Sequence, residues 1–117
     1  MGIDLNFWKY KGNTIFDAQD VYKKLSDGAY IDELVHLPIQ KILKDVEIAF
    51  KSWIKESEYA YEGEHGAFTI YTTEQFVRFD CYGMRQDDLN RIIDVMYEYG
   101  CPLYDSQISV RFDGDTS

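Results

Sequence analysis

The sequence predicts a single α+β domain spanning residues 1–117, in which a four-stranded antiparallel sheet carries two main helices on one face. Its 117 residues are a length typical of one domain that can bury its own core. Four segments alternate apolar and polar side chains with a period of two, which is typical of half-buried strands. Two longer segments place apolar residues three and four positions apart, which is typical of amphipathic helices. Residues 113–117 are expected to form a loose tail.

The first strand is expected within residues 2–10, GIDLNFWKY. Its side chains alternate between two faces, with Ile3, Leu5 and Phe7 opposed to Asp4, Asn6 and Trp8. A short helix is expected over 17–28. Asp17 is a suitable N-cap for it, and Gly28 fits its end.

The main helix is expected over 38–56, PIQKILKDVEIAFKSWIKE, because Pro38 suits a first helical turn. Its apolar stripe consists of Ile39, Ile42, Leu43, Val46, Phe50 and Trp53. A second helix is expected over 85–100, where Gly100 and the following Pro102 mark the end. The apolar stripe of this second helix consists of Leu89, Ile92, Ile93 and Met96.

Three further strands complete the predicted sheet. Residues 67–73, AFTIYTT, and 75–83, QFVRFDCYG, are expected to pair through a tight turn, and 107–112, QISVRF, forms the last strand. Without the short extra helix, the order is β-α-β-β-α-β, the split βαβ arrangement of ferredoxin-like sandwiches. The preference for right-handed crossovers favours this closure of the pattern.

Such a sandwich leaves one sheet face without helices. If the apolar side chains of the strands point toward the helices, the other face carries Trp8, Arg78, Asp80 and Tyr82. Large aromatic side chains on an uncovered face are typical of recognition surfaces. We therefore expect this face to be one candidate partner-binding surface.

A second candidate is the segment 56–66, ESEYAYEGEHG, which is expected to link the main helix to the strand hairpin. Its carboxylates can accept paired hydrogen bonds from arginine, and its tyrosines supply rigid contact area. The candidate contact residues here are Glu56, Glu58, Tyr59, Tyr61, Glu62 and Glu64. The alternative is a solvated connecting loop whose tyrosine rings lie against the adjacent helix, and the sequence supports both interpretations equally.

The formal net charge of −9 argues against nucleic acid as the partner, because acidic charge repels phosphate backbones. The basic and glycine-rich strand motif of RNA-binding sheets is also missing from 75–83. A basic protein would instead be attracted. The alternative is that the charge only keeps a small protein soluble.

No catalytic, metal or cofactor site is predicted. The only histidines are His36 and His65, no serine or cysteine stands in a nucleophile motif, and no metal-ligand spacing is present. We therefore expect a protein that is not an enzyme and binds no cofactor. Cys81 and Cys101 are expected to be reduced, buried thiols, and the spacing does not show whether they lie close together. No segment is apolar enough for a membrane span or a signal peptide, which favours a cytoplasmic protein.

The stretch GCPLYDSQISVRF, residues 100–112, resembles an ending found in immunity proteins of bacterial contact-dependent growth inhibition and polymorphic toxin systems. The sequence departs from that ending at Ser106, where proline is usual. The resemblance implies a cytoplasmic inhibitor that binds a cognate toxin domain, often a nuclease. It implies no particular binding residue, because the stretch also suits a structural role.

The resulting hypothesis is an immunity protein whose acidic and aromatic surface covers the substrate cleft of a basic toxin domain. Two other classes stay open. One is a regulatory or scaffold domain that self-associates as a homodimer, and the other is a ferredoxin-like domain that binds a small molecule.

Overall fold

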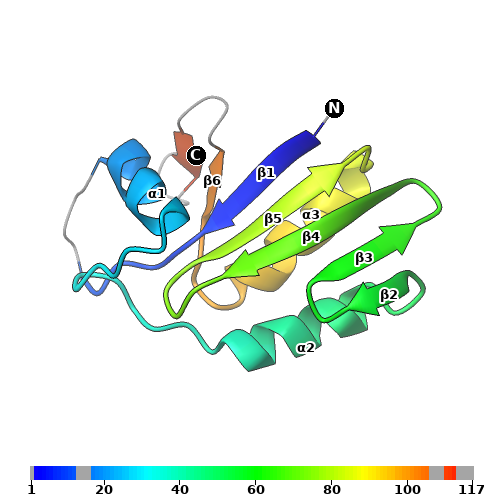
Figure 1. Ribbon diagram of the computed structural model, residues 1–117, viewed down its shortest axis with the longest axis horizontal. Helices are drawn as coiled ribbons and strands as arrows, with labels where there is room; N and C mark the ends of the chain where they lie inside the picture. Colours follow the sequence, from blue (N-terminus) through cyan, green and yellow to red (C-terminus); the bar gives the residue numbers. More distant parts are fainter. Residues whose placement is uncertain (1, 13–16, 106–109, 113–117) are drawn as a thin grey trace.

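The computed structural model describes residues 2–12, 17–105 and 110–112, and it shows an α+β fold with one antiparallel sheet. The predicted loose tail, 113–117, lies outside the described residues. The described strands are β1 (Gly2–Phe7), β2 (Ile54–Ser57), β3 (Ala60–Gly63), β4 (Gly66–Thr72), β5 (Val77–Tyr82), β6 (Leu103–Asp105) and β7 (Val110–Phe112). The described helices are α1 (Ala18–Ser26), α2 (Ile39–Ala49) and α3 (Gln86–Tyr97). Figure 1 shows the sheet running diagonally across the molecule.

The prediction of a four-stranded ferredoxin-like sheet is wrong, because the described residues alone form a sheet of seven strands in the order β2-β3-β4-β5-β1-β6-β7. The hairpin of β2 and β3 extends the sheet beyond β4 at one edge. At the other side, the strand beside β1 is β6 rather than the predicted strand 107–112. Residues 110–112 of that predicted strand form β7, which pairs with β6 at the edge, and 107–109 lie outside the described residues.

The extra hairpin exists because α2 ends seven residues before the predicted helix end at position 56. Phe50 leaves the helical conformation, and the Trp53 amide then bonds the Phe50 carbonyl in a turn at 2.9 Å. The Trp53 ring packs edge-on against Phe50, with ring centroids 5.0 Å apart, and it also lies over Gly63 of β3. A Cβ at Gly63 would stand 2.6 Å from that ring, so only glycine permits this approach. Trp53 therefore lies outside α2, although its position continues the apolar spacing of the helix. Its ring packs against the main core from the turn that follows α2.

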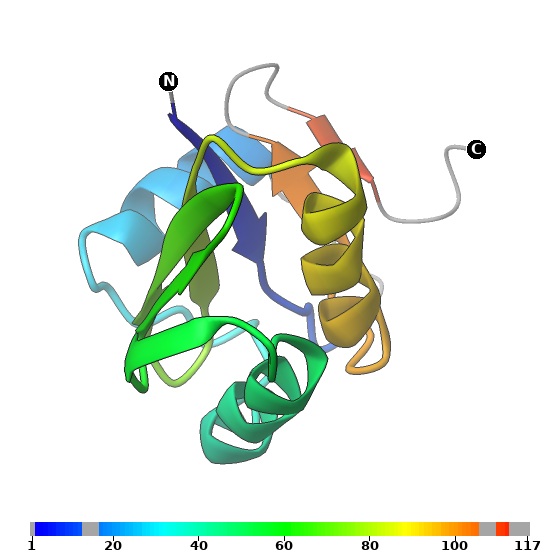
Figure 2. The same ribbon diagram turned by 90° about the vertical axis from the view of Figure 1, so that its right-hand side faces the viewer.

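The main core lies between the sheet and the pair α2 and α3, which cover one face together (Figure 2). Its strand residues are the predicted inward-facing ones, such as Leu5, Phe7, Phe79 and Cys81. Phe68 of β4 stands at its centre and touches the rings of Phe50, Tyr61 and Phe79. This layer fixes which strand positions point to the opposite, outer face of the sheet.

Helix α1 lies on that outer face, across the sheet from α2 and α3 (Figure 2). As predicted, Asp17 caps it, and its carboxylate accepts a bond from the Gln19 amide at 3.0 Å. A second core cluster forms beneath α1 and comprises Trp8, Val21, Leu25, Leu34, Phe76 and Tyr104. The outer face is therefore partly covered, and the exposed side chains of Glu62, Thr69 and Tyr82 mark its open part.

Candidate protein-binding surface

The predicted loop 56–66 is a β-hairpin at the edge of the sheet, followed by the turn into β4 (Figure 1). Ser57 and Ala60 are partners across the β2–β3 ladder, and the Tyr59 amide bonds the Ser57 hydroxyl at 3.1 Å. A short side-chain-to-backbone bond of this kind stabilises a tight turn. The acidic residues are thus carried by a fixed sheet extension, which is a better platform for recognition than a free loop.

The hairpin exposes most of its predicted contact residues. The side chains of Glu56, Glu58, Glu62 and Glu64 are exposed, and Tyr59 is 39% exposed. The expectation that Tyr61 is an exposed contact residue is corrected, because Tyr61 is only 2% exposed. Its ring stacks on Phe68 in the main core, with ring centroids 5.1 Å apart. Its ring therefore offers no contact area to a partner.

The expectation that Trp8 lies exposed on an open sheet face is also corrected, because its side chain is completely buried. It does lie on the outer side, but α1 and the segment after it cover this part. Its indole packs against Phe76 and Tyr104 at ring-centroid distances of 6.3 and 5.2 Å. The period-two pattern correctly placed Trp8 on the outer side of the sheet. It could not show that α1 and the segment after it cover this part of the sheet.

Arg78 and Asp80 occupy the middle of the outer face and neutralise each other. The Arg78 Nε atom lies 3.3 Å from the Asp80 carboxylate, and the guanidinium stands 4.9 Å above the Tyr71 ring. Both charged side chains are about one quarter to one third exposed. Tyr82, by contrast, is 53% exposed. Arg78 therefore shapes the surface, whereas Tyr82 is available for contact.

The strand register joins the two predicted surfaces. Tyr82 is the partner of Ala67, and Ala67 is the partner of Glu62, so these three side chains form one row across β5, β4 and β3. The adjacent row consists of Asp4, Asp80, Thr69 and Ala60. We call the larger polar and aromatic members of these rows the acidic face: Asp4, Glu62, Thr69, Asp80 and Tyr82.

The acidic face has more negative than positive charge. Asp4 accepts hydrogen bonds from the Tyr22 hydroxyl at 3.0 Å and from the Asn6 amide at 2.9 Å, which leave its charge in place. The thiol of Cys81 lies behind the face, and its pKa is raised to about 12, first by burial and then by the carboxylates of Asp80 and Asp4. Within the described residues, Glu62 forms no ion pair. The carboxylates of the described acidic face are those of Asp4, Glu62 and Asp80, and Arg78 of the neighbouring row pairs with Asp80.

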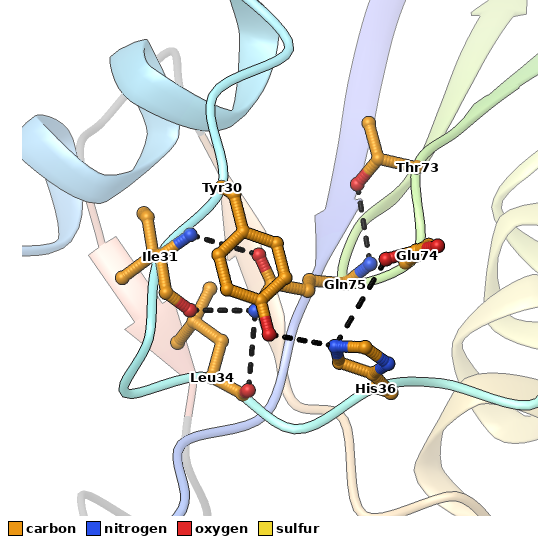
Figure 3. Close-up of polar contacts among 7 residues, drawn as sticks. All are labelled: Tyr30, Ile31, Leu34, His36, Thr73, Glu74 and Gln75. Carbon is orange, nitrogen blue, oxygen red and sulfur yellow. Dashed lines mark hydrogen bonds and ion pairs between the residues drawn. The ribbon is translucent and has the colours of Figure 1, made fainter.

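A separate polar cluster lies where the segment between α1 and α2 meets the turn between β4 and β5 (Figure 3). The Tyr30 hydroxyl lies 2.8 Å from Nε2 of His36, and the Glu74 carboxylate lies 3.9 Å from the same nitrogen. In an acid–base relay the two partners would bind the two different ring nitrogens, one to react and one to orient the ring. Because both partners here converge on Nε2, the arrangement is typical of a structural contact.

Gln75 is the buried member of this cluster, and sequence reasoning missed it. Its side chain accepts a bond from the Ile31 amide at 2.9 Å and donates to the carbonyls of Ile31 and Leu34 at 2.5 and 3.2 Å (Figure 3). These bonds satisfy backbone groups of Ile31 and Leu34 in the segment that follows α1. They also connect this segment to the turn between β4 and β5, where Gln75 lies. Gln75 therefore helps to hold the cover over Trp8. Nothing in the sequence distinguishes it from an exposed glutamine.

Within the described ranges 2–12, 17–105 and 110–112, no cluster of three or more histidine, cysteine, aspartate or glutamate side chains has the geometry to hold a metal ion. None of their helices has the length and apolar character needed to cross a membrane. Cys81 and Cys101 are buried, as predicted, and both belong to the main core.

Comparisons with known proteins give no assignment. No family model, curated protein or solved structure matches the chain. The residues of the acidic face and the hairpin are therefore the basis for inferring a function.

Proposed function

We propose that the chain is an immunity protein that binds a basic toxin domain and covers its substrate cleft. The observation that carries the proposal is the joining of Glu62, Asp80 and Tyr82 on one uncovered part of the sheet. The exposed glutamates of the hairpin continue this surface around the edge of β2. A nuclease is the expected toxin class, because a cleft that binds a phosphate backbone is basic.

The chemistry of the surface supports a basic protein as the partner. Carboxylates accept charge-assisted hydrogen bonds from arginine and lysine, and Tyr82 adds a rigid aromatic side chain that is already half exposed. The net charge of −9 would steer such a partner toward the protein at long range. The same charge opposes direct binding of RNA or DNA by this face.

The resemblance of residues 100–112 to immunity-protein endings supports the same proposal from another part of the chain. Part of this stretch forms β6, whose Tyr104 is buried in the second core cluster. These residues contribute to the fold, so the resemblance concerns the class of protein and the acidic face concerns the contact. As an inhibitor of a toxin that acts on nucleic acid, the protein would work in the cytoplasm.

Co-expression with the product of the adjacent upstream gene tests the proposal. If that product ends in a basic toxin domain, we expect the chain to restore growth of cells that express the domain and to co-purify with it. Loss of nuclease activity in the purified complex would support cleft blocking. Failure to restore growth and to form a complex would contradict the proposal.

Self-association is the second candidate, and one observation favours it. Strand β2 is bonded to β3 on one side only, and its Ile54 is 67% exposed. An unpaired strand edge is a template for pairing with a second copy. However, β2 has only four residues and an irregular register between Lys55 and Ser57, features that protect an edge from pairing. Sedimentation of the purified protein over a concentration series distinguishes a monomer from a homodimer.

A further inference from the structure

A hollow of about 290 Å³ lies between α2 and the β2–β3 hairpin, on the helix side of the sheet. It is separate from the acidic face, which lies on the outer side. Its main lining side chains come from α2 (Leu43, Lys44 and Glu47) and from the hairpin (Lys55, Glu58 and Tyr61). We call this hollow the socket.

The lining of the socket includes Tyr61, whose ring is buried and whose hydroxyl is open to a hydrogen bond. Tyr61 is 2% exposed, and its hydroxyl has no hydrogen-bond partner among the described residues. Loss of solvation raises the pKa of this phenol, and charges on Lys55, Glu47 and Glu58 act on it as well. The hydroxyl therefore lies among the charged residues of the socket, while its ring is stacked on Phe68. Among the described residues, this hydroxyl is not one of the fully buried polar atoms that lack a partner, so it reaches solvent in the socket, where a ligand atom can bind it.

The charges of the socket are only partly paired. Lys55 donates a hydrogen bond to Glu47, so these two side chains neutralise each other. Within the described part of the chain, Glu58 and Lys44 take part in no ion pair. Lys44 is exposed on α2, where its flexible chain can turn toward water. Glu58 lies in the hairpin turn, whose backbone is fixed by the Ser57 contact.

We propose that the socket receives an arginine side chain of the basic partner. The guanidinium would donate to the Glu58 carboxylate and to the Tyr61 hydroxyl oxygen, and the aliphatic stem would lie against Leu43. Arginine suits this set because its planar group donates in several directions at once. A carboxylate ligand would instead need Lys44 and would meet the negative charge of Glu58. This inference rests on the proposed function and adds an anchor beside the acidic face.

Titration of the isotope-labelled protein with N-acetyl-arginine amide, followed by NMR, tests the socket without the toxin. We expect millimolar binding with shifts at the amides of Lys44, Glu58 and Tyr61, and no comparable shifts with N-acetyl-glutamate amide. Tyr61→Phe keeps the stacked ring and should weaken binding about tenfold, because it removes an acceptor for a charged donor. Glu58→Gln should weaken binding about as much, because it removes the negative charge that pairs with the guanidinium. Lys44→Gln should strengthen binding of the arginine probe, because it removes a positive charge from the lining of the socket. Preference for the glutamate probe, weaker binding by Lys44→Gln, or no shifts with either probe would overturn the inference.

The toxin separates failure of the socket from failure of the proposed function. If Tyr61→Phe and Glu58→Gln leave toxin affinity unchanged while Glu62→Lys reduces it, the socket is wrong and the acidic face stands. If the native protein binds the arginine probe but no toxin domain, the socket stands and the proposed function is wrong. The thermal unfolding temperature of each variant must match that of the native protein, which shows that the fold is intact.

Discussion

Glu62 and Tyr82 lie in one row across three strands, each directly opposite Ala67 of β4. Strands in a sheet are about 4.8 Å apart, so the backbones of the two residues are separated by about 10 Å. Glu62 comes from the hairpin and Tyr82 from the strand on the far side of β4. Glu62 and Tyr82, which the sequence assigned to two separate candidate surfaces, therefore lie on one continuous surface.

The contrast between Trp8 and Tyr82 predicts opposite effects on stability. Trp8→Ala should reduce the free energy of unfolding by about 3–5 kcal/mol, because it opens a cavity in the second core cluster. Tyr82→Ala should change it by less than about 0.5 kcal/mol, because the ring is exposed. Urea unfolding of both variants measures this. Equal stability of the two variants would contradict the assignment of Trp8 to the core.

Gln75→Ala should destabilise the cover of the second core. Removing the side chain leaves the buried carbonyl of Leu34 and the polar groups of Ile31 without their partner, at a cost of about 1–3 kcal/mol. Hydrogen exchange at the Ile31 amide should speed up more than exchange in α3. Glu74→Ala is the control, because the Glu74 side chain is exposed and, among the described residues, makes only a long contact with His36. An unchanged Ile31 exchange rate in Gln75→Ala would show that the amide is protected by other means.

Stability should fall at alkaline pH, partly through Tyr99. Burial and a hydrogen bond to Asp45 raise the pKa of Tyr99 to about 12 in the folded protein. Because the unfolded phenol titrates near about pH 10, the stabilisation is complete below that pH and is lost as the pH rises toward 12. Tyr99→Phe should show a smaller decrease of unfolding temperature over this range, whereas Tyr97→Phe should follow the native protein. The prediction fails if all three proteins give the same pH profile.

Salt should slow association with a basic toxin domain. The attraction between the acidic protein and its partner acts at long range, and ions screen it over about 10 Å at 0.1 M ionic strength. Stopped-flow association rates should therefore fall as salt rises, with dissociation rates changing less. An association rate that does not depend on salt would contradict the electrostatic part of the proposal.

Local patterns predicted much of the fold. The alternation in residues 3–8 and 77–82 identified which strand side chains enter the main core, and Asp17 marked the start of α1. The number of strands could not be obtained in this way. Ile54–Ser57 has no buried residue, and Leu103–Asp105 has three residues, so neither carries a period that reveals a strand. Both strands form through backbone hydrogen bonds to a neighbouring strand, β2 to β3 and β6 to β1.

The candidate site was only partly predictable for the same reason. The exposed glutamates follow from composition, because charged side chains are rarely buried. The burial of Trp8 and Tyr61 depends on α1 and on the stacking against Phe68, which are contacts between distant segments. The row shared by Glu62 and Tyr82 depends on the register of strands that were not all predicted. Long-range pairing therefore decides which of the predicted residues can reach a partner.

The most direct test of the account is calorimetric titration of a cognate toxin domain with the double variant Glu62→Lys, Tyr82→Ala. Asp94→Lys is the matched control, because Asp94 is exposed on α3 at the other layer and the charge change is the same. We predict that the double variant loses at least about tenfold in affinity at unchanged unfolding temperature, whereas the control loses little. Equal affinities of the double variant and the native protein would contradict the claim that the acidic face binds the partner.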